Sequence, residues 1–364
     1  MKNIIATLAG FLLCAAAFAE APELKNMMPN SWKKLTRLSE AEERGILESV
    51  QVKNDISTLK SVRESRIYKE SVNGIGFYRV LNCNEAISDF LTGDYKDRTV
   101  SREDYDDFIR HKIQQIVYLK ETSSKLVRLI DLEFRQFGAT TGNHETDASA
   151  YFVFEDLFIK KLNKNEIGFF ITEATIDFPL AYDDAPVDLV YGKTKNQQMG
   201  GNSCRFFKIR NDADIAVAFE ECKRDFRYVI SIDASTYLFD PKCPLRYSIQ
   251  NAFDGDPATS YVENTEDDLM EIIFQGCFDY KKIRIVNGYA QNKNLYLSNN
   301  RVKKMNNYIL SDNIMEEQLV TFNEEQTSVE IQDLYKGLKY NDTCIAELNV
   351  LSNKRGWLFG DIDE

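Results

Sequence analysis

The sequence predicts an N-terminal α+β domain followed by an all-β sandwich, and three observations lead to this prediction. At 364 residues the chain is long enough for two domains of ordinary size. Apolar residues recur at helical spacing in several stretches before residue 137, whereas short β-branched and aromatic runs dominate from Tyr151 onward. In the last third of the chain, apolar and polar residues alternate as they do in half-buried antiparallel strands.

The first 19 residues are predicted to be a signal peptide. Lys2 provides a positive charge at the start, and an apolar stretch runs from Ile4 to Ala17. Ala17-Phe18-Ala19 then gives the small-x-small pattern that signal peptidase requires, here before Glu20. We therefore expect an exported protein that is periplasmic, on the outer surface or secreted, with no transmembrane segment in the mature chain.

Two alternatives exist for this leader. An uncleaved membrane anchor is disfavoured because the apolar stretch is shorter than the roughly 20 residues that span a bilayer. A lipoprotein signal ending at Cys14 is disfavoured because Leu13 is larger than the small residue that normally precedes such a cysteine. Cleavage after Ala19 is the preferred interpretation.

Charge and cysteine content limit the partners. The net charge of −12 argues against nucleic acid, because phosphate recognition needs clustered positive charge. An even number of cysteines in an exported chain is compatible with disulfides, for example Cys204–Cys222 or Cys243–Cys344, and free buried thiols are the alternative. Structural zinc is disfavoured, because the sequence has no CxxC pair and only two histidines. The six cysteines beyond the leader are Cys83, Cys204, Cys222, Cys243, Cys277 and Cys344.

The α+β domain is expected over residues 25–240. Ser39-Glu40-Ala41-Glu42 has the form of a helix capping box, and a helix capped at Ser101, continued by itself or by a second helix, is predicted up to about Phe137. Strands are predicted at Tyr151–Phe154 and Ile167–Ile171. We thus expect helices first and strands after.

A boundary between the two domains is predicted at Asp240–Pro244, which has two prolines in five residues. The first domain contains no recognisable nucleophile, metalloprotease or phosphate-loop motif. We therefore expect no organic cofactor, name no catalytic residue and regard enzymatic activity as the less favoured interpretation.

The turn Asp254-Gly255-Asp256-Pro257 brings two carboxylates close together, with the hydroxyl of Thr259 three residues on from Asp256. Converging carboxylate, hydroxyl and carbonyl oxygens suit calcium, which takes six to eight oxygen ligands. Glu347 is a further acid in an otherwise apolar segment, where an unpaired carboxylate would be costly. An ordinary polar turn is the alternative interpretation.

Four segments of the C-terminal part resemble the discoidin-type (F5/8 type C) family. More narrowly, they are similar to the glycan-binding, or translocation, domain of secreted NAD glycohydrolases. The resemblance covers residues 243–351, under a third of the chain. The segments are Ala252–Glu263, Asn287-Gly288-Tyr289, Asn300-Arg301-Val302 and Tyr340–Glu347.

The resemblance implies a discoidin-like (galactose-binding-like) jelly-roll sandwich whose loops recognise carbohydrate. It also implies a structural calcium, Ca²⁺, at Asp254, Asp256, Thr259 and Glu347. The sequence departs from the family pattern in two places. Tyr261 stands where the family usually has tryptophan, and Asn264–Leu269 replaces a glycine-rich turn with acids.

The residues themselves suggest which side chains would contact a glycan. Aromatic rings can stack on the C–H faces of sugars, and Asn and Arg donate directional hydrogen bonds to hydroxyls. Each of these residues has a structural alternative: a core position, an ion pair or a turn. The candidate glycan-binding residues are Tyr261, Asn287, Tyr289, Asn300 and Arg301.

These observations favour an exported bacterial carbohydrate-binding protein. One alternative is a secreted glycan-active enzyme with an unrecognised N-terminal catalytic domain. Another is a structural envelope protein whose sandwich makes protein contacts and binds no sugar.

Overall fold

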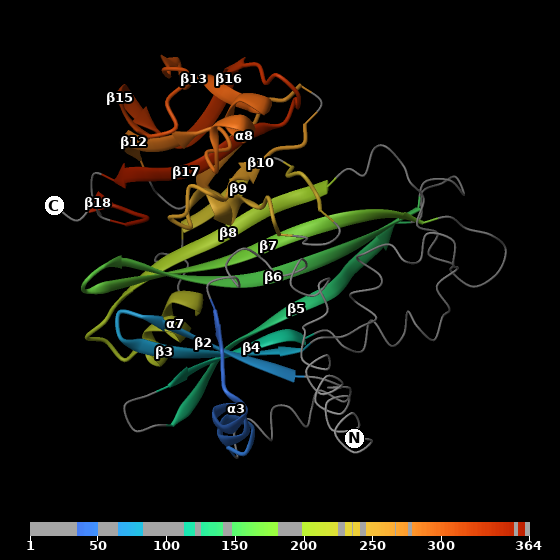
Figure 1. Cartoon of the computed structure of the whole chain (residues 1–364), viewed down its shortest axis with the longest axis vertical. Helices are drawn as coiled ribbons and strands as arrows, with labels where there is room; N and C mark the ends of the chain where they lie inside the picture. Colours follow the sequence, from blue (N-terminus) through green and yellow to red (C-terminus); the bar gives the residue numbers. More distant parts are fainter. Residues whose placement is uncertain are drawn as a thin grey trace, which may run out of the picture.

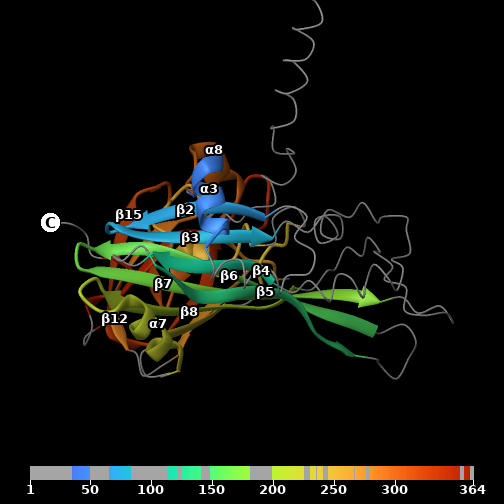
Figure 2. The same cartoon turned by 90° about the horizontal axis from the view of Figure 1, so that it is seen from below.

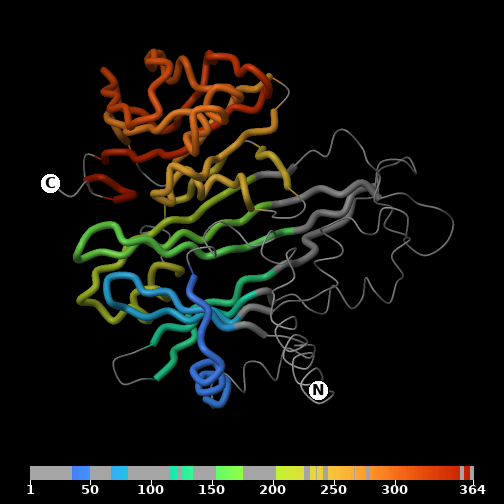
Figure 3. Tube along the Cα trace, in the orientation of Figure 1, coloured from blue at the N-terminus to red at the C-terminus, as the bar shows by residue number. Residues whose placement is uncertain are grey.

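The structure is a computed structural model, and its chain path is shown in Figure 3. It describes residues 35–49, 65–82, 113–120, 125–140, 148–180, 199–224, 230–234, 236–240, 245–265, 267–275, 279–352 and 356–360. The predicted signal peptide lies outside these ranges. Within them, no helix has the length and apolar character needed to span a membrane.

The N-terminal part is an antiparallel meander in which consecutive strands pair (Figure 1). Its central strands are long, and neighbouring strands stay paired along most of their length. The strands are β1 (Thr36–Arg37), β2 (Ser65–Val72), β3 (Ile75–Asn82), β4 (Ile113–Lys120), β5 (Leu126–Thr140), β6 (Ala148–Asn163), β7 (Glu166–Leu180), β8 (Met199–Arg210) and β9 (Ile230–Ala234).

The predicted helix from Ser101 to Phe137 is wrong where the structure describes it, because β4 and β5 occupy that segment. The residues from Gln115 to Leu119 are all buried, so both faces of β4 are covered by protein. A strand buried on both faces has no regular polar side. Periodicity alone cannot distinguish such a strand from a helix.

Two helices accompany the described part of this sheet, α3 (Glu40–Leu47) and α7 (Ile215–Arg224). The predicted capping box is confirmed: the Glu42 N–H donates to Ser39 Oγ over 3.4 Å, and the Ser39 N–H donates to Glu42 Oε2 over 3.2 Å. Ile46 and Leu47 of α3 pack on the outer face of β2, β3 and β4 (Figure 2). The described N-terminal part is therefore mainly β.

Strands β6, β7 and β8 form a central layer whose two faces are both buried. Phe169 and Phe207 face α7 and the strands β3 to β5, with their rings stacked 5.6 Å apart. Phe170 and Phe206 face the opposite way, with centroids 4.5 Å apart, and belong to a core shared with the C-terminal part. Figure 1 shows the sandwich on one side of this layer and β2 to β4 on the other.

The C-terminal part is a β-sandwich, as predicted. β12 pairs with both β15 and β17, and β11 pairs with β16. β13 pairs with both β16 and β17 and so links the two groups of strands. A short helix α8 (Lys293–Ser298) and a 3-10 turn η4 (Ile249–Ala252) complete it. The strands are β10 (Tyr261–Val262), β11 (Glu271–Gln275), β12 (Tyr280–Asn287), β13 (Asn300–Met305), β14 (Tyr308–Ile309), β15 (Glu317–Gln326), β16 (Ser328–Tyr335), β17 (Thr343–Ser352) and β18 (Gly356–Trp357).

The two parts share one continuous sheet. β9 pairs with β8 on one side, through Asn202 and Ala234, and with β11 of the sandwich on the other, through Ile272 and Ala234. β9 precedes the predicted boundary at residues 240–244, yet its hydrogen bonds join it to the sandwich. The strand is the covalent and hydrogen-bonded bridge between sheet and sandwich.

A chain of buried polar side chains crosses the same junction. Asp156 of β6 accepts hydrogen bonds from Gln115 of β4 over 2.9 Å and from Gln250 of η4 over 3.5 Å. Thr172 of β7 donates to Gln250 over 2.6 Å, and Arg79 of β3 lies 3.9 Å from Asp156. Buried polar groups are costly unless they are paired. This network therefore holds η4 in one position on the sheet.

Candidate functional site

Asn287 and Val302 join the end of β12 to the start of β13. Asn287 Nδ2 donates to the Val302 carbonyl over 2.7 Å, and the Val302 N–H donates to Asn287 Oδ1 over 2.9 Å. The Asn287 side chain is completely buried. It pairs with a backbone as a neighbouring strand would, so its role here is to connect two strands.

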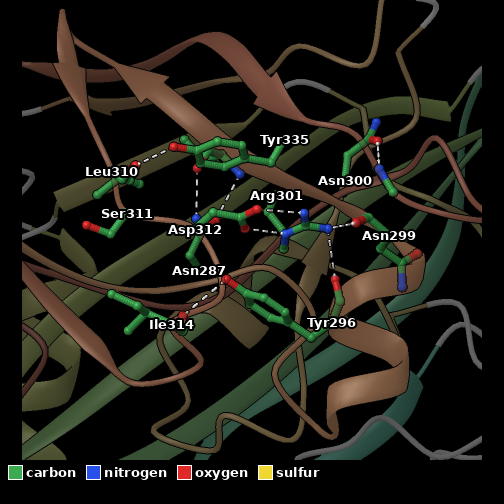
Figure 4. A network of polar contacts seen from close by, with 12 residues as sticks. Asn287, Tyr296, Asn299, Asn300, Arg301, Leu310, Ser311, Asp312, Ile314 and Tyr335 are labelled. Atoms are coloured by element: carbon green, nitrogen blue, oxygen red, sulfur yellow. Dashed lines mark hydrogen bonds and ion pairs between the residues drawn. The ribbon is translucent and has the colours of Figure 1, made fainter.

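Arg301 lies at the centre of a closed polar network (Figure 4). Its Nε and Nη2 atoms donate to the two carboxylate oxygens of Asp312 over 2.8 and 3.2 Å. Its Nη1 donates to the carbonyls of Tyr296 and Asn299 over 3.3 and 3.0 Å. The hydrogen bond from Arg301 holds the pKa of Asp312 below its usual value. With 5% of its surface exposed, Arg301 anchors a loop and the end of α8.

Gly288 explains why a glycine follows Asn287. Its φ of +71° lies in the left-handed region. A Cβ at this position would lie 2.9 Å from side-chain atoms of Tyr296 and Arg301. The Asn287-Gly288 motif thus lets the chain turn closely past the Arg301 network.

Asn300 fixes the loop that precedes β17. Its Oδ1 accepts a hydrogen bond from the Gly337 N–H over 2.8 Å, and its Nδ2 donates to the Asn341 carbonyl. The residue is completely buried. It therefore supports the surface loop 336–342 from below.

Tyr261 is also interior. Its ring is completely buried in the core shared by sheet and sandwich, and its hydroxyl donates to the Thr236 carbonyl over 3.0 Å. The replacement of the family's usual tryptophan by Tyr261 therefore affects the packing of the core.

Four members of the predicted glycan-binding set lie in the interior of the protein. Tyr261, Asn287, Asn300 and Arg301 are buried and hold backbone segments, so in this structure they present no face to a ligand. Tyr289 is the one member of the set that is partly exposed. Burial raises its pKa to about 12, and the side chains of Tyr247 and Arg246 lie close enough to influence it.

The surface at this end of the sandwich carries an aromatic residue outside the predicted set. Tyr340 is 40% exposed, and the ammonium group of Lys339 lies 4.7 Å from its ring centroid. The neighbouring Leu338 is 83% exposed. The sequence signal was present, because Tyr340 opens the segment that carries the family resemblance.

The backbone of this loop is held against α8. The N–H groups of Leu338 and Tyr340 donate to the carbonyls of Leu297 and Ser298 over 2.9 and 2.8 Å. A Cβ on Gly337 would lie 2.5 Å from the Ser298 carbonyl oxygen, so only glycine fits there. Residues 337–340, called the Tyr340 loop below, are therefore presented in a defined position.

The predicted calcium residues lie together on the side of the sandwich that faces the sheet. Asp254 is buried; its Oδ1 accepts from the Asp256 N–H over 2.7 Å, and its Oδ2 accepts from the Thr259 hydroxyl over 2.8 Å. Asp256 accepts from the Ala258 N–H over 3.1 Å. These contacts describe a turn whose carboxylates are hydrogen-bonded within the turn itself.

Glu347 of β17 approaches Asp254, as the prediction required. Its pKa is raised to about 8, mainly because it is buried, while the charge of Lys160 acts in the opposite direction. A hydrogen bond with Asp254 raises the pKa further, and one from the Gly255 N–H lowers it. Its Oε1 atom is buried and makes no hydrogen bond. Glu347 and Asp254 therefore share one polar site.

Lys160 was not predicted to belong to this site. It lies on β6 of the N-terminal sheet, and its Nζ donates to the Phe253 carbonyl over 3.0 Å. A Cβ on Gly255 would lie 3.1 Å from both Nζ and Cε of Lys160. This contact could not be predicted from sequence, because Lys160 and Phe253 are 93 residues apart along the chain.

The contacts of this site do not fit a calcium cage. Calcium needs six to eight free oxygen ligands, yet both oxygens of Asp254 accept protein hydrogen bonds and an ammonium group stands beside the turn. In the described residues, no group of three or more His, Cys, Asp or Glu side chains could hold a metal ion. Calcium at Asp254, Asp256, Thr259 and Glu347 stays a prediction.

The two suggested disulfides are absent. Cys204 is a buried free thiol whose pKa burial raises to about 12, and it lies 3.6 Å from the Thr172 hydroxyl. Cys344 is also a buried free thiol. Cys204 and Cys344 are therefore not bridged here, and the structure does not show the suggested pairs Cys204–Cys222 and Cys243–Cys344. Cys83, Cys243 and Cys277 lie outside the described residues.

Comparison with solved structures gives a weak similarity that carries no argument about function. A family 89 glycoside hydrolase from Clostridium perfringens, solved in complex with 2-acetamido-1,2-dideoxynojirmycin, is similar over 37% of this chain at 18% identity. Its TM-score is 0.23, and the chain spans 15% of the hydrolase's length. No curated protein matches the chain.

The family comparison concerns the C-terminal part. The matched stretch begins upstream of β9, so it includes the strand that pairs with both sheet and sandwich. The four segments that carried the resemblance lie inside it. The resemblance is confirmed: residues 224–351 match the NAD glycohydrolase translocation F5/8 type C domain.

Proposed function

We propose that the C-terminal sandwich is a carbohydrate-binding module of an exported protein, and that it contacts a glycan at the end that carries the Tyr340 loop. The observation that supports this most directly is the exposed ring of Tyr340 within a domain of the F5/8 type C family. Tyrosine is suited to this role because its ring stacks on apolar faces while its hydroxyl remains hydrated.

The proposed surface is formed by loops that are tied together. Lys336 forms an ion pair with Asp268 at 2.7 Å, and the Thr343 hydroxyl donates to the Asp268 carbonyl over 2.6 Å. The buried carboxylate of Glu263 accepts from the Thr343 N–H over 3.2 Å. Ordering these loops before binding lowers the entropy lost on association. The arrangement therefore favours recognition of a ligand by a rigid surface.

Tyr289 and Asp342 supply the other groups at this end. The Gly288 N–H donates to the Cys344 carbonyl over 3.1 Å, which places Tyr289 beside the start of β17. Burial raises the pKa of Asp342, and the neighbouring Asp268 adds to this effect. Carboxylates accept hydrogen bonds from sugar hydroxyls. We expect Tyr340 and Tyr289 to provide ring contacts and the acids to provide polar ones.

A glycan array on the full chain tests this proposal with a matched pair of variants. Tyr340→Ala should weaken binding to any selected glycan at least several-fold, because the stacking of the aromatic ring on the sugar is lost. Tyr308→Ala is the control. The exposed fraction of Tyr308 is 38%, similar to the 40% of Tyr340, and Tyr308 pairs with Met305 at the far end of β13. It should bind as the wild type does.

Two results would overturn the proposal. One is a folded wild-type protein that binds no glycan on the array; the sandwich would then serve protein contacts. The other is an equal loss with Tyr340→Ala and Tyr308→Ala, which would move the binding surface away from the Tyr340 loop.

A further inference from the structure

We propose that Lys160 of the N-terminal sheet supplies the cation of the Asp254–Glu347 site, so that the sandwich is held to the sheet by an internal ammonium group and needs no calcium there. The inference concerns the side of the sandwich that faces β6 and does not depend on glycan binding.

The first support is the position of the ammonium group. Lys160 Nζ donates to the Phe253 carbonyl over 3.0 Å, one residue before Asp254. The Cα of Gly255 lies so close that an added Cβ would meet Nζ and Cε at 3.1 Å. A Cβ on Gly360 would lie 3.9 Å from Cε on another side. Lys160 therefore fits between Gly255, in the turn that contains the acids, and Gly360 near the end of the chain.

The second support is the state of the oxygens. The two carboxylate oxygens of Asp254 accept from Asp256 and Thr259, and Glu347 accepts from the Gly255 N–H. A metal would have to share these oxygens with the donors that already contact them. Lysine brings one positive charge and three N–H donors, and so requires only acceptors around it. An ammonium group can therefore lie beside the turn without rearranging its hydrogen bonds.

The third support is electrostatic. The ammonium group at the Phe253 carbonyl brings a positive charge next to the buried carboxylate of Asp254. Removing one partner of a buried charge cluster leaves the other charge uncompensated, which is strongly destabilising. The site would therefore lose stability without Lys160 unless another cation took its place.

Thermal unfolding of the full chain, with calcium and with chelator, tests the proposal. The wild-type midpoint should be the same in both conditions. Lys160→Met removes the charge and retains most of the stem, so its midpoint should fall by several degrees in chelator and rise when calcium is added. Lys161→Met is the matched control, since Lys161 is the next residue on β6 and is exposed. It should match the wild type in both conditions.

Each contrary result overturns the proposal. If calcium raises the wild-type midpoint and Glu347→Gln abolishes that rise, the site takes metal despite Lys160. If Lys160→Met unfolds at the wild-type midpoint, the site does not need this cation. Should Lys160→Met fail to fold, Lys160→Arg decides: a midpoint near that of the wild type supports the role of the positive charge, and an arginine variant that also fails to fold overturns it.

Discussion

Arg301 and Lys160 each bring a positive charge to acids of the sandwich, but they come from different parts of the molecule. Arg301 is a residue of β13, and its partners Asp312, Tyr296 and Asn299 lie within 11 residues of it along the chain. Lys160 lies on β6 of the N-terminal sheet and reaches the turn that contains Asp254.

The two charged clusters therefore differ in whether their residues come from the sandwich alone or from both the sandwich and the N-terminal sheet. The Arg301 network is complete within the sandwich, and we expect it in an isolated module of this kind. The Asp254–Glu347 site is complete only when the N-terminal sheet is in place. The sandwich of this protein therefore depends on the sheet for the second of these charged clusters, in addition to the β9 pairing and the shared aromatic core.

The largest expected effect is in the Arg301 network. Arg301→Ala leaves Asp312 and two carbonyls without their donors, so we expect the free energy of unfolding to fall by about 3–5 kcal/mol. Urea denaturation of the full chain measures it. A variant that keeps wild-type stability and loses glycan binding would contradict the structural role and restore Arg301 as a ligand contact.

A smaller effect is expected from acid. The folded pKa of Asp312 lies below its unfolded value of about 3.9. The stability from its pairing with Arg301 is therefore present above about pH 4 and is lost as the pH falls through the folded pKa. Asp312→Asn lacks this contribution, roughly 1 kcal/mol for a partly exposed pair. The difference in free energy of unfolding between the wild type and Asp312→Asn should become smaller below pH 4. A difference that does not change with pH would show that the charge of Asp312 does not contribute.

The smallest effect is expected at Glu347. Because burial and Asp254 raise its pKa to about 8, the carboxyl group is mostly protonated at neutral pH. The amide of Glu347→Gln has the same shape and can donate to Asp254, so unfolding at pH 7 should change by no more than about 1 kcal/mol. Chemical denaturation measures it. A loss as large as that of Arg301→Ala would mean that Glu347 is ionised and pairs directly with Lys160.

The comparison also explains which predictions from sequence succeeded. The capping box at Ser39 and Glu42 and the alternating strands of the sandwich depend on neighbours in the chain, and both are confirmed. The helix predicted up to Phe137 failed because β4 is covered on both faces by other strands and α3. The sequence of β4 itself does not indicate that other elements cover both of its faces.

The candidate site divides in the same way. The segments Asn287-Gly288 and Asn300-Arg301-Val302 could be selected from sequence because both belong to the pattern that resembles the F5/8 type C family. Their chemistry did not show whether they face a ligand or the protein interior. Asparagine and arginine donate equally well to a sugar hydroxyl and to a backbone carbonyl, and only packing distinguishes the two.

By itself, the sequence determined that the C-terminal part is a β-sandwich of the F5/8 type C family, because alternation, turn residues and the four polar segments are properties of consecutive residues. Tertiary structure alone decided that Tyr261 and Arg301 are interior, that Tyr340 is exposed and that Lys160 stands beside Asp254. Burial and long-range charge pairing depend on elements that are distant in the chain and meet only when the sheet and the sandwich pack together.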